Sequence, residues 1–145
     1  MSKPVRSTLA VLLHADVVGS TRLVQSSEIE AHTSMRLAFS ELSTAVKSRN
    51  GIVHEIRVDA LVAEFLRPSD AVLAALTFQD EWRTGHASST RADQHPLLRI
   101  GIAMGEVVIA DGTITGAGVV LAQRLELLAP AGGRLRLRGR TRAPP

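Results

Sequence analysis

The sequence contains no cysteine among its 145 residues. This absence excludes disulfide bonds, zinc–thiolate sites and thiol nucleophiles, so any metal ion would have to be held by oxygen or histidine ligands. Long apolar runs are also missing, since no stretch approaches the ~20 residues that a membrane-spanning helix needs. The apolar run Leu9–Leu13 is cut short by His14 and Asp16 and makes a poor signal peptide. We therefore expect a cytoplasmic protein that does not enter a membrane.

Glycine and proline are too scarce for a low-complexity chain, with 11 and 6 residues respectively. Hydrophobic residues make up 45% and charged residues 21% of the sequence, which is close to the average of soluble globular proteins and excludes wholesale disorder. The length is typical of one domain, because domains commonly contain ~100–200 residues. We therefore predict a single domain.

Positive charge is scarce over most of the chain. Residues 1–130 hold 12 basic and 14 acidic residues, a net charge of −2, whereas residues 131–145 add five arginines and bring the total to +3. These arginines are Arg134, Arg136, Arg138, Arg140 and Arg142. We predict a short final strand and a basic tail over residues 131–145, for which a solvated end and a truncated end are both open interpretations. A basic tail can contact phosphates without specificity, but we do not expect nucleic acid as a partner.

In the first half of the chain, hydrophobic spacing predicts a strand, a helix and a hairpin. Leu9–Val18 is rich in apolar and branched residues and is typical of a buried strand. A helix of about twenty residues is predicted next, ending at Asn50–Gly51. Its apolar face contains Met35, Ala38, Phe39, Leu42, Ala45 and Val46. Ile52–Ile56 and Leu61–Phe65 predict a hairpin with Asp59 at its tip.

The second half predicts a helix, a strand pair and a further helix. Pro68–Thr84 has a helix-start signal and helical spacing. Leu97–Met104 and Glu106–Ala110 are interpreted as two paired strands, Asp111–Gly112 as a turn, and Gly116–Leu128 as the last helix. Strands and helices in this order predict an α+β fold of the ferredoxin-like, split βαβ kind, with an antiparallel-leaning sheet and helices packed on it.

Two aspartates stand out as candidate metal ligands. Asp16 closes an otherwise apolar strand before a turn of small residues, and Asp59 closes another at a hairpin tip. Adjacent central strands would bring the two residues together. Carboxylate oxygens suit hard cations such as Mg²⁺, which takes one or two carboxylates plus substrate phosphates. Without further context, the interpretation of both residues as turn formers is the favoured one.

Four segments carry a family resemblance that covers nearly the whole chain. They are LHADVVGSTRL (13–23), DALVAEF (59–65), LRIGIAMGEV (98–107) and GAGVVLAQRLE (116–126). In this order they resemble the first metal motif, the second metal hairpin, the following strand pair and the transition-state helix of class III nucleotidyl cyclases, the adenylate and guanylate cyclases. The resemblance implies a cyclase homology domain whose core is residues 1–130.

The resemblance also implies a reaction and its residues. Asp16 and Asp59 would hold two divalent metals, Mg²⁺ or Mn²⁺, and Arg124 would stabilise the transferring phosphoryl group across a homodimer interface. The backbone at the first helix start would bind the triphosphate through Val17, Gly19, Ser20 and Thr21. The implied enzyme is a phosphorus–oxygen lyase that converts ATP or GTP to the 3′,5′-cyclic monophosphate and pyrophosphate.

Two positions would select the base. Glu55 lies four residues before Asp59, where guanylate cyclases have glutamate and adenylate cyclases usually have lysine, and Thr113 matches the second selecting position. Glu55 would accept from guanine N1–H and the 2-amino group, while the Thr113 hydroxyl would donate to O6. Alternatively, Glu55 is a solvated strand residue and Thr113 is a turn residue. The choice between ATP and GTP as substrate therefore stays open.

Three departures from the family favour a second function. Val120 replaces an asparagine that positions the ribose, Val58 replaces a glycine, and the chain stops before strands that carry a phosphate-binding lysine. They favour a degenerate cyclase domain that binds nucleotide or acts as a regulatory dimerisation module. We interpret His14 as a hydrogen-bonded structural residue, with metal binding as its alternative, and Glu64 as a surface or interface charge.

Overall fold

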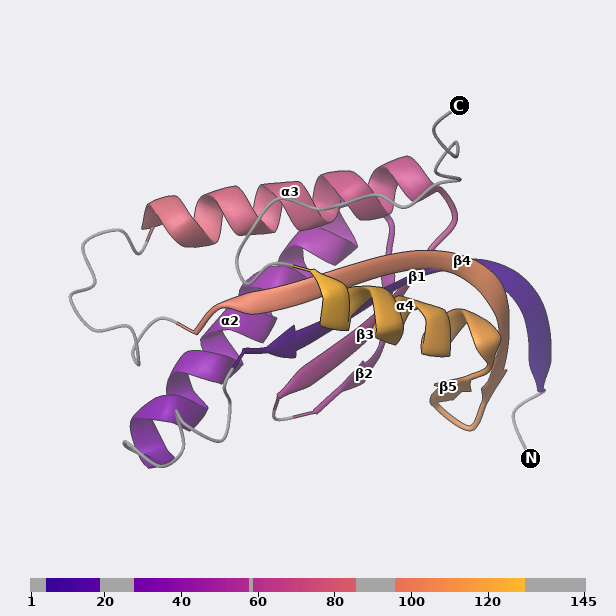
Figure 1. The fold of residues 1–145 in the computed structure, drawn as a ribbon, viewed down its shortest axis with the longest axis horizontal. Coiled ribbons are helices and arrows are strands. Elements are labelled where there is room, and N and C mark those ends of the chain that lie inside the picture. Colours follow the sequence, from indigo (N-terminus) through magenta and orange to yellow (C-terminus); the bar gives the residue numbers. More distant parts are fainter. Residues whose placement is uncertain (1–4, 19–27, 58, 86–95, 130–145) are drawn as a thin grey trace.

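The structure, a computed structural model, describes residues 5–18, 28–57, 59–85 and 96–129. These residues form five strands and three helices (Figure 1). In chain order the elements are β1 (Arg6–Val17), α2 (Glu28–Ser48), β2 (Ile52–Ile56), β3 (Ala60–Phe65), α3 (Pro68–Gly85), β4 (Leu98–Ala110), β5 (Thr113–Thr115) and α4 (Ala117–Leu128).

The five strands form one antiparallel sheet in the order β2-β3-β1-β4-β5. The order of β1 to β4, with α2 and α3 as the connections, is that of a ferredoxin-like split βαβ unit. The predicted α+β fold class is therefore confirmed. β1 is the central strand, so a residue at its end has neighbours on both sides.

The two faces of the sheet are covered differently. Because strand side chains alternate between faces, Leu13 and Ala15 face α2 and α3, whereas Leu12 faces α4. The first face carries the larger core, and Figure 1 shows α2 and α3 on one side of the sheet and α4 on the other. Trp82, predicted to anchor α3, is buried there, and its indole N–H donates to the Pro96 carbonyl at 2.9 Å. The smaller core under α4 leaves part of its face open.

The predicted pair of strands between residues 97 and 110 is wrong. β4 is one continuous strand, in which Gly105 pairs with Ala10 of β1. Gly105 serves close packing instead of a turn, since an added Cβ would lie 2.7 Å from the Gly118 Cα of α4. The real hairpin follows at the predicted turn, where Asp111 and Gly112 have φ values of 50° and 77°. This pair of positive φ angles is typical of the tight turns that join twisted antiparallel strands.

The remaining boundaries agree with the predictions to within a few residues. α2 ends before Asn50, whose φ of 60° is the left-handed conformation that stops helices. The hairpin of β2 and β3 and the helix α3 lie where they were predicted. The predicted strand Arg134–Arg138 and the basic tail lie outside the described residues. None of the helices in the described ranges is long and apolar enough to span a bilayer.

Candidate functional site

The pairing of β1 with β3 brings the two candidate metal ligands together. Asp16 is opposite Ala60 in the register of these strands. The Val17 N–H donates to the Asp59 carbonyl at 3.1 Å, which joins the end of β1 to the hairpin tip. Asp16 is half-buried and Asp59 is exposed. Both carboxylates therefore stand at one edge of the sheet, within reach of solvent and of a ligand.

The electrostatics of this edge favour a cation. Burial and the neighbouring charge of Asp59 raise the pKa of Asp16, opposed by a hydrogen bond from the Val17 N–H and by the charges of His14 and Arg99. A bound cation would relieve the repulsion between the two carboxylates. No cluster of three or more His, Asp or Glu side chains able to hold a metal occurs among the described residues. The residues present thus fit a hard cation that takes two carboxylates and completes its shell with phosphate oxygens and water.

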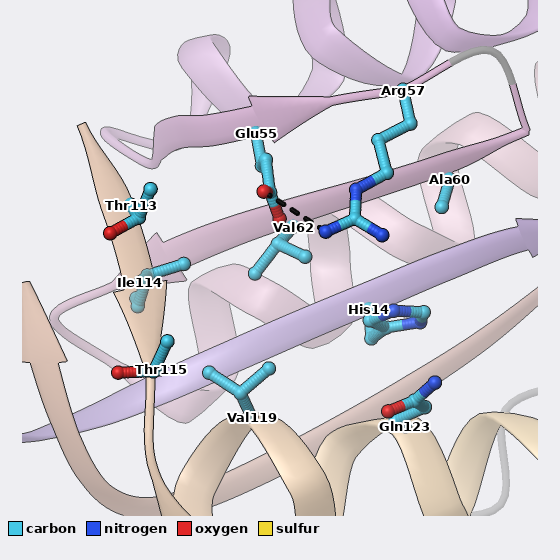
Figure 2. A pocket seen from close by; sticks show the side chains of 10 residues that line it. All are labelled: His14, Glu55, Arg57, Ala60, Val62, Thr113, Ile114, Thr115, Val119 and Gln123. Atoms are coloured by element: carbon cyan, nitrogen blue, oxygen red, sulfur yellow. Dashed lines mark hydrogen bonds and ion pairs between the residues drawn. The ribbon is translucent and has the colours of Figure 1, made fainter.

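A cavity of about 340 Å³ opens beside this edge. It is lined by His14, Glu55, Arg57, Ala60, Val62, Thr113, Ile114, Thr115, Val119 and Gln123 (Figure 2). The two predicted base-selecting residues, Glu55 from β2 and Thr113 from β5, thus lie in the same cavity although 58 positions separate them in the sequence. Ala60, next to Asp59, connects the cavity to the carboxylate edge.

Both base-selecting side chains already make contacts in the cavity wall. Arg57 Nη2 donates to Glu55 Oε1 at 3.2 Å (Figure 2), which holds the carboxylate on the wall. The Thr113 hydroxyl donates to the Ala110 carbonyl at 2.7 Å. A hydroxyl has a single hydrogen to donate, so Thr113 would have to rotate before it could donate to a base.

The predicted phosphate-binding backbone is only partly described. Val17 is buried, and its N–H is engaged with Asp59, so it is not available to a phosphate in this structure. Gly19, Ser20 and Thr21 lie outside the described residues, as does Val58. Their predicted roles stay predictions.

The helix α4 presents different residues to the cavity and to solvent. Val119 and Gln123 line the cavity, whereas Val120 and Arg124 do not line it and are exposed. α4 lies against β4 at Gly101, where an added Cβ would collide with the backbone of Ala122 and Glu126. The predicted catalytic Arg124 is therefore held on the outer side of a firmly seated helix.

His14 is the main site residue whose environment was misjudged. Its side chain is 8% exposed and lines the cavity, but its Nδ1 has no hydrogen-bond partner among the described residues. The expectation of a hydrogen-bonded His14 is wrong for this atom. Burial lowers the pKa of His14, although the nearby Asp16 opposes this shift. The sequence could have placed His14 on the same face as Asp16, because residues two apart in a strand point to the same side. The same spacing could have placed Arg57 beside Glu55.

Two glutamates are more buried than the sequence indicated. Glu64, expected as a surface or interface charge, is buried, and its Oε1 is 3.0 Å from Arg6 Nη2 and 2.7 Å from His54 Nε2. Glu126 of α4 is 2% exposed, and its Oε2 has no hydrogen-bond partner among the described residues. Burial and the charge of Asp16 raise the pKa of Glu126 to about 7, opposed by Arg99. A carboxyl group thus lies beneath α4, near the Asp16 edge.

Comparisons with known sequences agree with the cyclase resemblance. No protein-family model matches the chain. A protein of Rhizobium meliloti named putative adenylate cyclase 3 is 32% identical over 130 residues, which are 89% of this chain and 22% of that protein. An uncharacterised protein of Mycobacterium tuberculosis is 33% identical over 132 residues, 89% of this chain and 42% of that protein. The chain therefore spans less than half the length of these relatives.

Solved structures give the same result for the fold. An adenylate/guanylate cyclase/hydrolase from Silicibacter pomeroyi has a TM-score of 0.79 at 28% identity, covering 89% of this chain and 75% of that one. The adenylyl cyclase CyaB from P. aeruginosa has a TM-score of 0.73 at 22% identity, with 90% and 76% covered. The guanylyl cyclase Cya2 has a TM-score of 0.70 at 22% identity, with 90% and 74% covered. The chain therefore has the fold of the class III adenylate/guanylate cyclase domains.

Proposed function

We propose that the chain converts a purine nucleoside triphosphate to the 3′,5′-cyclic monophosphate and pyrophosphate, with Mg²⁺ or Mn²⁺, at a site completed by a second copy of the chain. The observation that carries this proposal is the β1–β3 pairing, which brings Asp16 beside Asp59. The name of the Rhizobium relative supports it as well.

The two carboxylates would bind the metal ions, and their mutual repulsion favours that binding. Divalent ions held there would lower the pKa of the ribose 3′-hydroxyl and neutralise charge on the leaving pyrophosphate. Asp16, fixed in β1 with partners on β3 and β4, would give the bound triphosphate a defined position. This preorganisation supports an in-line attack on the α-phosphate.

Glu55 supports guanine as the preferred base. Its carboxylate lies in the cavity with Arg57 on one oxygen, and its remaining lone pairs would accept from guanine N1–H and the 2-amino group. Adenine offers no such pair of donors on that edge. Thr113 would contribute to O6 after its hydroxyl leaves the Ala110 carbonyl.

Arg124 supports a composite site. It is exposed on α4 and does not line the cavity of its own chain. The same helix exposes apolar side chains, namely Val120, Leu121, Leu127 and Leu128, which a second copy would cover. A two-fold dimer would create two equivalent sites, each combining the aspartates of one chain with Arg124 of the other.

The direct test is to incubate the pure protein with GTP or ATP and Mn²⁺ and to separate the products by chromatography. We expect a cyclic monophosphate. The composite site is tested by mixing two inactive variants, Asp59→Ala and Arg124→Ala. After subunits exchange, half of the dimers contain one copy of each variant, and each of these has one intact site of two. Activity should therefore return to about a quarter of that of the unsubstituted protein. A mixture as inactive as its components would overturn the composite site.

Val120 favours a second candidate, a domain that binds nucleotide or a partner without catalysis. This residue is 47% exposed on α4 and cannot form the hydrogen bond that the family's asparagine gives the ribose. Tight nucleotide binding without any cyclic product, in a protein that light scattering shows to be dimeric, would support the regulatory module instead.

A further inference from the structure

His14 is a buried polar residue that the described part of the chain leaves unsatisfied. Its side chain is more than nine-tenths buried, it lines the cavity, and its Nδ1 has no hydrogen-bond partner there. Buried ring nitrogens normally have partners, because an unpaired one loses its hydration without compensation. His54, on β2, is the contrasting case, since its Nε2 contacts Glu64 Oε1 at 2.7 Å. Because Nδ1 itself is closed to solvent, a ligand in the cavity would satisfy it once the imidazole ring turns toward the cavity.

The strand register places His14 and Glu55 in one row across the sheet. Glu55 of β2 is opposite Val62 of β3, and Val62 is opposite His14 of β1. Directly opposed residues point to the same face. Neighbouring strands are about 4.8 Å apart, so Glu55 and His14 stand about 10 Å apart with Val62 between them.

The cavity therefore has two polar ends, with valine side chains and the guanidinium of Arg57 between them. Figure 2 shows Glu55 and Thr113 toward one end of the view and His14 and Gln123 toward the other. Val62 and Val119 lie between them, together with the guanidinium of Arg57. Apolar walls with a few placed polar groups are typical of sites for small organic molecules.

We propose that His14 is a second recognition residue for the nucleoside, whose Nδ1 forms a hydrogen bond with N7 of the base or with a ribose hydroxyl while the Watson–Crick edge meets Glu55. This inference rests on the proposed function, because it takes a purine nucleotide as the occupant. Either group satisfies the ring nitrogen, since histidine donates or accepts at Nδ1 according to its tautomer.

The test compares analogues that each lack one polar atom. Binding of GTP, 7-deaza-GTP, 2′-deoxy-GTP and 3′-deoxy-GTP is measured with Mn²⁺ by equilibrium competition on ice. The proteins are the unsubstituted chain, His14→Phe and His14→Asn, since asparagine keeps a polar atom near the position of Nδ1. His54→Phe is the matched control, because it removes a half-buried histidine whose partner is Glu64.

We expect the unsubstituted protein to bind one analogue about ten- to a hundredfold more weakly than GTP, as for one lost buried hydrogen bond. His14→Phe should bind GTP and that analogue equally, whereas His14→Asn and His54→Phe should keep the difference. The identity of the analogue then separates the base from the ribose.

Three results would overturn the inference. In the first, His14→Phe binds GTP and keeps the analogue profile of the unsubstituted protein. In the second, the unsubstituted protein binds GTP and all analogues equally. In the third, His14→Phe changes only the dimer dissociation measured by light scattering, which would assign the unsatisfied nitrogen to the partner chain. Failure of the proposed function is a separate result, because the unsubstituted protein would then bind neither GTP nor ATP, and the inference would fall with it.

Discussion

The two faces of the sheet differ in how completely their polar groups are satisfied. Three buried side-chain atoms in the described ranges have no hydrogen-bond partner: His14 Nδ1, Arg99 Nε and Glu126 Oε2. The register places His14 and Arg99 on the face under α4, and Glu126 belongs to α4 itself. The face under α2 and α3 has none among the same residues. The face under α2 and α3, here called the closed face, therefore supplies stability. The face under α4, here called the half-open face, holds polar groups that a ligand, a metal or a second chain would satisfy.

The largest expected effect lies on the half-open face. Asp16→Ala and Asp59→Ala should each reduce the proposed cyclase activity below about a thousandth, because a metal-stabilised transition state depends on several kcal/mol of charge compensation. Product formation at saturating Mn²⁺ measures this loss, and circular dichroism should show an unchanged fold. Substantial activity in either variant would contradict the assignment of that residue as a ligand.

The next effect concerns the closed face. Phe78 is buried between α3 and the sheet and stacks on Trp82 with ring centroids 5.9 Å apart. Phe78→Ala should lower the free energy of unfolding by about 3–5 kcal/mol, because it removes apolar contacts and leaves a cavity. Urea unfolding monitored by Trp82 fluorescence measures it. The comparison of the faces predicts that Thr115→Ala, at the cavity, changes stability by less than about 1 kcal/mol.

A smaller effect tests the base preference. Glu55→Lys replaces hydrogen-bond acceptors by donors and places a second cation beside Arg57, so the ratio of GTP to ATP binding should fall by about ten- to a hundredfold. Competition with unlabelled nucleotides measures this ratio. Glu55→Gln is the control of similar size, with an intermediate shift expected. An unchanged ratio in the lysine variant would show that Glu55 does not contact the base.

The smallest effect is the pH dependence caused by Glu126. Its folded-state pKa of about 7 exceeds the ordinary value of 4.5, so the folded protein holds this proton more tightly than the unfolded chain. Stability from the protonated group is fully present below about pH 4.5 and is lost as the pH rises through 7. Glu126→Gln should therefore unfold like the unsubstituted protein at pH 5 but be about 1–3 kcal/mol more stable at pH 8. Thermal unfolding in EDTA measures this difference, and equal gains at both pH values would contradict it.

Most of the closed face could be predicted from the sequence, because its signals are local. The helical spacing around Met35 and Phe39 and the stop at Asn50 define α2 directly. The break predicted in β4 failed because Gly105 has no local sign of its contact with Gly118, which is far away in the sequence. A glycine that permits close packing and a glycine that permits a turn look the same in one sequence.

The half-open face was predictable only where a motif identified a residue. Asp16, Asp59, Glu55 and Thr113 were found through the cyclase resemblance, and the structure brings the first two together and the last two into one cavity. His14 was misjudged because its missing partner depends on which side chains other strands and α4 bring near it. The spacing of hydrophobic residues along the chain gives no sign that a hydrogen-bond partner will be missing.

The seating of α4 on β4 has a mechanical consequence for any ligand-driven motion. Side-chain volume is missing at Gly101, Gly105 and Gly118, so the helix backbone rests directly on the strand backbone. Without flexible side chains between them, the two elements cannot slide past each other as packed helices do in shear motions. If the cavity closes around a ligand, α4 and β4 would therefore move as one rigid body, and Arg124 would move with them. Gly101→Ala would push α4 away from β4, because the added Cβ would collide with the backbone of Ala122 and Glu126.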